Sequence, residues 1–136
     1  MIRPIMKSEV IFGWHIEDAT LDDLAVAQDL LDTLEAHADT CVGLAANMIG
    51  VRKRVIAFVD GVERRAMLNP EIVQAQGPYR AEEGCLSLVG KRSATRYKRI
   101  KVRYTGMDLK ERTEQFAGWT AQIIQHEVDH CNGVVI

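Results

Sequence analysis

The sequence predicts an α+β fold, and two observations lead to that prediction. Near the amino terminus and again near the carboxyl terminus, apolar residues recur at steps of three and four, the period of one helix face. Between these segments lie short stretches rich in β-branched residues, bounded by Gly, Pro, Asn or Asp, as is typical of strands. Strands clustered between two helices, instead of alternating with them, favour α+β over a βαβ repeat.

The first helix is expected to be amphipathic and to run from about Leu21 to about Ala38. Thr20 precedes it as an N-cap residue, and Asp22 and Asp23 lie in its opening turn, where the helix dipole favours negative charge. Its apolar face consists of Leu21, Leu24, Ala27, Leu30, Leu31, Leu34 and Ala38.

Short antiparallel strands are expected in the middle of the chain. Three of them precede turn or stop signals: Val55–Val59 before Asp60–Gly61, Ala66–Leu68 before Asn69–Pro70, and Ile72–Gln76 before Gly77–Pro78. A further strand is predicted where Ile100, Val102 and Tyr104 alternate with basic residues. It is expected to pair with Thr113–Ala117 across a turn at Gly106–Lys110.

Length and composition set the limits of the fold. The chain has 136 residues, 47% of them apolar, which predicts a single domain, residues 1–136, around one core. The net charge of −2 predicts no sequence-specific nucleic-acid partner. The charges are segregated, since Ser8–Val51 holds nine acids and no Lys or Arg, whereas Lys91–Lys101 holds six basic residues and no acid. Two solvated faces of opposite sign explain this pattern, and a patch for RNA or an acidic partner is the alternative.

The compartment is inferred from apolar runs and cysteines. The longest unbroken apolar run, Val55–Val59, has five residues, far short of the roughly 18 that a membrane span needs. No secretory signal is visible in the first fifteen residues, and three cysteines make an odd number. These features predict a cytoplasmic protein without membrane contact or a disulfide framework.

The last predicted helix carries the residues with the clearest chemistry. It begins after Gly118, ends near Asn132–Gly133 and contains the pentapeptide His-Glu-Val-Asp-His at 126–130. Residues four apart lie one turn above each other, so both imidazoles can bind one metal while Glu127 lies beside it to transfer a proton. Asp129 lies on the far side of the helix, where a structural contact is expected.

A catalytic metal site generally takes three protein ligands and leaves one position for water. Only six residues follow His130, and none is Glu or His, which disfavours an endopeptidase with a downstream third ligand. Cys131 lies about 100° around the helix from His130 and should point elsewhere. Upstream candidates are Cys41, Cys85, His15 and His37. Neither histidine has a local feature in its favour, and spacing leaves the choice between Cys41 and Cys85 open.

Three separated segments resemble the three motifs of the peptide deformylase family, in the family's order. They are CVGLAANMIG at 41–50, EGCLS at 83–87 and QHEVDH at 125–130. The resemblance covers nearly the whole chain and implies that the strands wrap around the metal-binding helix. It also implies Cys85 as the third ligand beside His126 and His130, and Glu127 as the acid/base catalyst. The implied metal is Fe²⁺, with Zn²⁺ or another divalent metal as the alternative, since a thiolate suits either.

The resemblance also implies two hydrogen-bond donors for the formyl oxygen, which becomes negative as hydrolysis proceeds. One is the backbone N–H of Leu86, and the other is a glutamine amide in the first motif. This chain has Met48 at the glutamine position, and a thioether cannot donate a hydrogen bond. We therefore expect Met48 to lie beside the metal and catalysis to be slower than in a glutamine-bearing relative.

The substrate that the resemblance implies is an N-formylmethionyl peptide of a nascent chain, with transient ribosome contact. The backbone around Val42, Gly43 and Gly84 would pair with the extended peptide as an added strand. The methionine side chain would enter a pocket at positions matching Trp119, Gln122 and Ile123, which Gln122 makes more polar. Plain core packing is the alternative for Trp119 and Ile123.

The leading hypothesis is thus a metal-dependent hydrolase that removes the formyl group from N-formylmethionyl peptides. One alternative is a related paralogue that acts weakly or on another N-acyl group. The other is a catalytically silent relative that keeps the metal as a structural element or binds peptide termini. Retained Glu127 argues against silence, and Met48 argues for it.

Overall fold

The computed structural model describes residues 1–85 and 90–134. Within these ranges, five strands form one antiparallel sheet in the order β1-β2-β3-β4-β5, so strands adjacent in sequence are adjacent in space. The strands are β1 (Gly43–Ala45), β2 (Val55–Asp60), β3 (Glu63–Gly84), β4 (Lys91–Thr105) and β5 (Glu111–Ala117). The helices are α1 (Leu24–Ala36) and α2 (Gly118–Cys131), with 3₁₀ turns η1 (Glu9–Gly13), η2 (Leu21–Asp23) and η3 (Ala46–Ile49). The predicted α+β class is confirmed.

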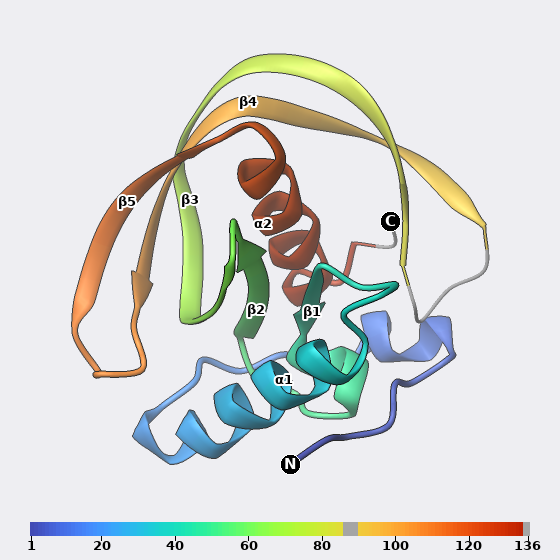
Figure 1. Ribbon diagram of the computed structural model, residues 1–136, viewed down its shortest axis with the longest axis vertical. Coiled ribbons are helices and arrows are strands. Elements are labelled where there is room, and N and C mark those ends of the chain that lie inside the picture. Colours follow the sequence, from blue (N-terminus) through green and yellow to red (C-terminus); the bar gives the residue numbers. More distant parts are fainter. Residues whose placement is uncertain (86–89, 135–136) are drawn as a thin grey trace.

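The sheet curves strongly and encloses α2 (Figure 1). The long strands β3 and β4 arch over this helix, while α1 lies on the other side of β1 and β2. Val55 to Phe58 are all buried because β2 contacts both α1 and α2. The unbroken apolar run in the sequence therefore reflects a strand that is covered on both faces. No helix within the described ranges is long and apolar enough to cross a membrane.

The predicted helix boundaries are confirmed to within a turn. Thr20 caps the first helix, since its side chain accepts from the Asp22 backbone N–H while Asp23 accepts from the Thr20 N–H. The opening turn is 3₁₀, and the α-helix proper begins at Leu24 and ends at Ala36. The second helix occupies the predicted segment.

Two predicted strand stops are wrong, because β3 runs through both Asn69–Pro70 and Gly77–Pro78. At the first pair the register with β4 shifts, and Asn69 adopts a left-handed φ of 52°. Its side-chain amide accepts from the Ala19 N–H at 2.7 Å and donates to the Ala19 carbonyl at 2.9 Å. The turn-forming pair is thus absorbed as a β-bulge that the N-terminal segment holds in place. At the second pair, Pro78 still lies opposite Tyr97 in the ladder.

The other predicted turns and the pairing of the last two strands are confirmed. The Asp60–Gly61 turn joins β2 to β3, and Gly61 has a positive φ of 63°. The Gly106–Lys110 turn joins β4 to β5, with the Gly106 N–H donating to the Lys110 carbonyl. Ile100 lies opposite Phe116 in this pair. This pairing continues the sheet at the end of the arch, where α2 begins directly after β5.

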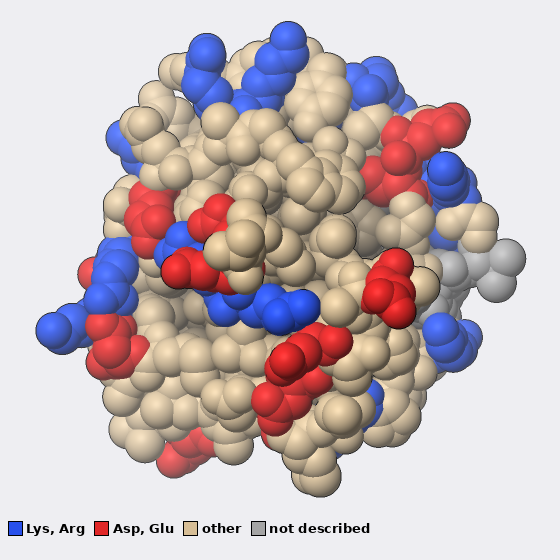
Figure 2. Space-filling model, in the orientation of Figure 1, with Lys and Arg blue, Asp and Glu red and all other residues tan. Residues whose placement is uncertain are grey.

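The basic segment at 91–101 lies on β4 and divides into two parts. Arg96 points inward and is buried in ion pairs, so the prediction of a solvated face is wrong at that position. Lys98 and Arg99 are exposed, as that prediction requires. Figure 2 shows Lys and Arg side chains along the top of the molecule, over the arch of β3 and β4.

Candidate active site

Three side chains that can bind a metal converge between β3 and α2. Cys85 directly follows β3, while His126 and His130 lie one turn apart on α2. One ligand atom from each residue lies within 4.8 Å of those of the other two. The two imidazole rings are 4.3 Å apart, centroid to centroid. The geometry thus brings Cys85, and not Cys41, to the histidine pair.

An unpartnered atom in this cluster supports metal binding. His130 is fully buried and its Nδ1 lies 3.1 Å from a Glu127 carboxylate oxygen. Its Nε2 has no hydrogen-bond partner among the described residues. A buried ring nitrogen without a partner costs about 1–3 kcal/mol, and a metal ion would use its lone pair. Two imidazole nitrogens and a thiolate are donors that suit Fe²⁺ or Zn²⁺.

The negative groups around the histidine pair favour a cation. Burial lowers the pKa of His126, but hydrogen bonds to Cys85 and Glu83 and the charge of Glu127 outweigh burial and raise it to about 10. Burial likewise lowers the pKa of His130, while the charge of Glu127 and its hydrogen bond to the ring raise it to about 9. Because a metal binds neutral imidazoles, it must displace protons from this pair as it binds.

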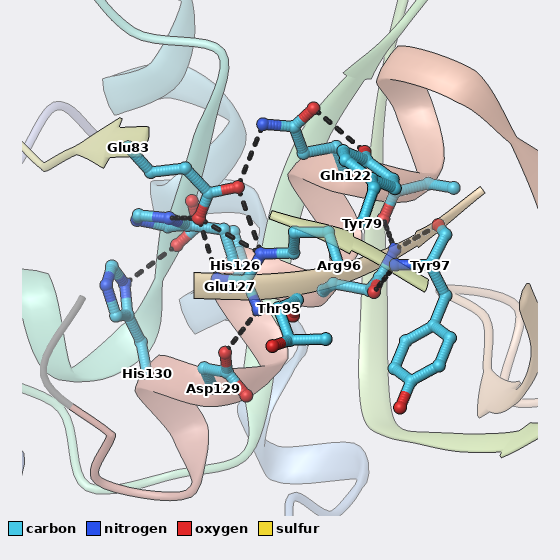
Figure 3. Close-up of polar contacts among 12 residues, drawn as sticks. Tyr79, Glu83, Thr95, Arg96, Tyr97, Gln122, His126, Glu127, Asp129 and His130 are labelled. Atoms are coloured by element: carbon cyan, nitrogen blue, oxygen red, sulfur yellow. Dashed lines mark hydrogen bonds and ion pairs between the residues drawn. The ribbon is translucent and has the colours of Figure 1, made fainter. Parts of the chain in front are cut away.

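Glu83, the next-to-last residue of β3, orients His126 (Figure 3). Its carboxylate lies 2.8 Å from His126 Nδ1 and accepts from Arg96 and from Gln122. Burial raises the pKa of Glu83, but these bonds outweigh it and hold the pKa at about 2. An ionised carboxylate on Nδ1 fixes the ring tautomer and leaves Nε2 for a metal.

Arg96 joins this carboxylate to the rest of α2. It is 3% exposed, and its Nη2 lies 2.7 Å from a Glu83 oxygen while its Nη1 lies 2.6 Å from an Asp129 oxygen. Asp129 therefore makes the structural contact expected of it and lies outside the group of ligand atoms. Sequence reasoning missed Glu83 and Arg96. The carboxylate two residues before Cys85 was an available signal, whereas nothing in the sequence distinguishes Arg96 from the other basic residues of 91–101.

Arg96→Met is expected to lower the free energy of unfolding by about 3–5 kcal/mol, because it leaves the buried Glu83 carboxylate and the partly exposed Asp129 carboxylate without their shared arginine. Urea unfolding of the metal-free protein measures this change. Arg103→Met is the matched control, since Arg103 on the same strand pairs with Glu71 at the exposed surface. Its change should be much smaller. Equal losses in the two variants would show that burial of the Arg96 pairs does not matter.

Glu127 lies against β1 as well as beside His130. It is almost fully buried, and a Cβ atom at Gly43 would come within 2.8 Å of its Oε2 and of the Ile123 side chain. Gly43 is therefore needed because β1 approaches α2 too closely for any other residue. This contact places the Glu127 carboxylate between the ligand cluster and the edge strand.

A cavity of about 290 Å³ opens onto these residues. Every described residue of the predicted substrate site lines it, together with two of the three ligands and Glu127. The predicted residues in its lining are Val42, Gly43, Met48, Gly84, Cys85, Trp119, Gln122, Ile123, His126 and Glu127. Leu86, the predicted backbone donor, lies outside the described residues.

The first predicted motif, all of it within the described residues, contributes no side-chain amide to the lining of this cavity. Met48 is 1% exposed, and its sulfur accepts from the Ala45 backbone N–H at 3.4 Å. The neighbouring Asn47 amide donates to the His130 carbonyl at 2.9 Å and so ties η3 to the end of α2. Asn47 is therefore committed to a structural bond.

The two other cysteines are not part of the ligand group. Cys41 lines the cavity, but its thiol donates to the Gly43 carbonyl at 3.0 Å, and burial raises its pKa to about 12. Cys131 is buried on α2, and burial raises its pKa to about 12 as well. Among the described residues, the group of converging ligand atoms contains Cys85 and neither of these two thiols.

A buried Cys-His-His group with a carboxylate beside it and a cavity in front of it is typical of hydrolases that use one metal ion. The sequence model of polypeptide deformylase matches residues 9–136. The chain is 48% identical to a peptide deformylase of Clostridium beijerinckii over 136 residues, the full length of both. It is 38% identical to one of Cytophaga hutchinsonii, covering 97% of this chain and 74% of that one. The chain belongs to the polypeptide deformylase family, a family of hydrolases.

Solved structures agree with this assignment. The peptide deformylase of Thermotoga maritima superposes with a TM-score of 0.89 at 30% identity, over 99% of this chain and 95% of that one. A class I type b enzyme of Acinetobacter baumannii, with Met-Ala-Ser bound, has a TM-score of 0.88 at 28% identity, over 99% and 97%. The curved sheet around a ligand-bearing helix is thus the deformylase fold.

Proposed function

We propose that this chain is a single-domain, cytoplasmic enzyme that removes the formyl group from N-formylmethionyl peptides of nascent chains, with transient contact to the ribosome. The observation that carries the proposal is the opening of the Cys85, His126 and His130 group, beside Glu127, into a cavity with an apolar wall. Family membership supports the reaction class. The similar Acinetobacter baumannii enzyme binds Met-Ala-Ser, a peptide of the kind that remains when a formyl group is removed.

In this mechanism Cys85, His126 and His130 would hold a divalent metal, Fe²⁺ or Zn²⁺. When bound, the metal polarises the formyl carbonyl and lowers the pKa of water. Glu127 takes the proton from the attacking water and passes it to the leaving amine. Burial beside Gly43 keeps its carboxylate in place for both transfers.

The peptide is proposed to bind as an extra strand. Among residues 1–85 and 90–134, β1 is the edge strand of the sheet and pairs only with β2, so its other edge can accept a peptide backbone at Val42 and Gly43. Gly84, at the end of β3, also lines the cavity. The first side chain of the peptide then lies against Trp119 and Ile123.

An anaerobic assay tests this function with formyl-Met-Ala-Ser and acetyl-Met-Ala-Ser, together with metal analysis of the same preparation. Hydrolysis of the formyl peptide with about one metal per chain is the expected result. Cleavage of only the acetyl peptide would indicate a paralogue for another N-acyl group. Bound metal without hydrolysis of either peptide would indicate a silent relative, the alternative that Met48 favours.

Met48→Gln is expected to raise kcat/KM on the formyl peptide without changing the metal content. A glutamine amide restores a donor to the cavity, and one such donor is worth about 10²–10³ in rate. The matched control is Met107→Gln, in the turn after β4, which should leave kcat/KM unchanged. An unchanged or lower rate in Met48→Gln would mean that another group already supplies the donor or that the formyl peptide is not the substrate. The acetyl peptide distinguishes these two cases.

A further inference from the structure

Gln122 places an amide in the wall of an otherwise largely apolar part of the cavity. It lies on α2 one turn before His126, it is half-buried, and its neighbours in the wall are Trp119 and Ile123. Moving an amide group out of water costs free energy unless the group gains hydrogen-bond partners in the protein. The partners of this amide therefore determine what the wall can accept.

Two hydrogen bonds fix the orientation of the amide (Figure 3). The Glu83 carboxylate accepts from the Arg96 guanidinium, and its other oxygen accepts from the Gln122 NH₂ group at 2.9 Å. The amide oxygen then faces Tyr79, whose hydroxyl donates to it at 3.1 Å. Rotating the amide by 180° would place its oxygen against the carboxylate and lose that hydrogen bond.

In this arrangement one N–H of the Gln122 amide has no acceptor among the described residues. The NH₂ group carries two N–H bonds, and within residues 1–85 and 90–134 only Glu83 accepts from it. Because Gln122 lines the cavity, a side chain that fills the cavity can reach this second N–H. A purely apolar side chain that fills the cavity strips water from this N–H and returns no acceptor. A side chain with an acceptor near its end compensates it.

We propose that Gln122 adapts this cavity to N-formyl peptides whose first residue is methionine sulfoxide. The inference rests on the proposed deformylase function. The sulfoxide keeps the length and the methyl group of methionine, which suit the walls at Trp119 and Ile123, and adds one oxygen that accepts a hydrogen bond. Methionine's own sulfur is only a weak acceptor. A peptide whose first residue is glutamine would instead bring the two N–H donors of its own amide against the apolar wall.

The reaction is the same for both substrates. Water breaks the formyl C–N bond, and the products are formate and a peptide with a free amino group. The sulfoxide is neither reduced nor oxidised. Gln122 contributes binding only, so the proposal concerns which peptide is preferred.

The test compares kcat/KM for formyl-Met-Ala-Ser and for its sulfoxide. In Gln122→Leu and in Gln122→Met, the ratio of the sulfoxide to the thioether value should fall about 5- to 100-fold, mainly through KM of the sulfoxide. A merely structural role of Gln122 in holding Glu83 would change both rates alike and leave the ratio unmoved. Tyr79→Phe, which removes one of the two hydrogen bonds that hold the amide, should shift the ratio in the same direction by less.

A binding measurement supplies a second readout. Calorimetry with Met-Ala-Ser and its sulfoxide should show the same change of preference in Gln122→Leu. Gln28→Leu, an exposed glutamine on α1, is the matched control and should leave both ratios unchanged. If the Gln122 variants hydrolyse the formyl-Met peptide with an unaltered ratio, the inference is wrong while the proposed function stands. If the wild-type protein hydrolyses neither peptide, both are wrong.

Discussion

Glu127→Gln should retain its metal and lose hydrolysis by about 10²–10⁴-fold or more. The side chain is not a member of the ligand group, so Cys85, His126 and His130 remain to hold the ion. An amide at this position fills the same space beside Gly43 but cannot accept a proton from water. The change therefore removes proton transfer and leaves the site otherwise intact.

The measurement is kcat/KM on a formyl-Met peptide, with metal content determined on the same sample. Glu82→Gln is the matched control, because Glu82 is an exposed carboxylate at the rim of the same cavity. It should change the rate little. Undiminished turnover by Glu127→Gln would remove Glu127 from the mechanism, and loss of metal would make it a ligand.

The fold was predictable where apolar residues recur with the period of one face of a helix or strand. The period of α1, the HExxH helix and the alternation around Ile100 each report burial directly, and the structure confirms all three. The long arms of the arch were not predictable in this way. On β3 after Gly77 and on β4 before Lys98, polar residues occupy most positions because one face of these strands is exposed to solvent.

Tertiary contacts explain the remaining misses. The Asn69–Pro70 pair usually ends a strand, but here the Asn69 side chain bonds to Ala19, fifty residues earlier, and no local pattern encodes that bond. β1 has three residues, too few for an alternation to be visible. The spacing of the HExxH histidines was sufficient to predict a metal site. Spacing did not decide whether Cys41 or Cys85 is the third ligand, because that depends on where β3 ends in space.

Cys85→Ala is expected to abolish stoichiometric metal binding, whereas Cys41→Ala should keep about one metal per chain. The structure gives the reason for the difference. Cys85 lies within the 4.8 Å group with both histidines, and Cys41 instead donates to the Gly43 carbonyl. Two imidazoles alone provide neither a third ligand nor the thiolate charge that offsets a divalent ion. Metal analysis after anaerobic reconstitution measures the outcome.

Unfolding with and without added metal separates loss of the ion from loss of the fold. A ligand that binds only the native state stabilises it by about 2.7 kcal/mol at 100 times its Kd. Wild type and Cys41→Ala should both show such a gain on adding Zn²⁺, and Cys85→Ala should show none while still unfolding cooperatively. Because Cys41 and Cys85 line the same cavity, the pair is closely matched, and a gain in Cys85→Ala with none in Cys41→Ala would assign the third ligand to Cys41.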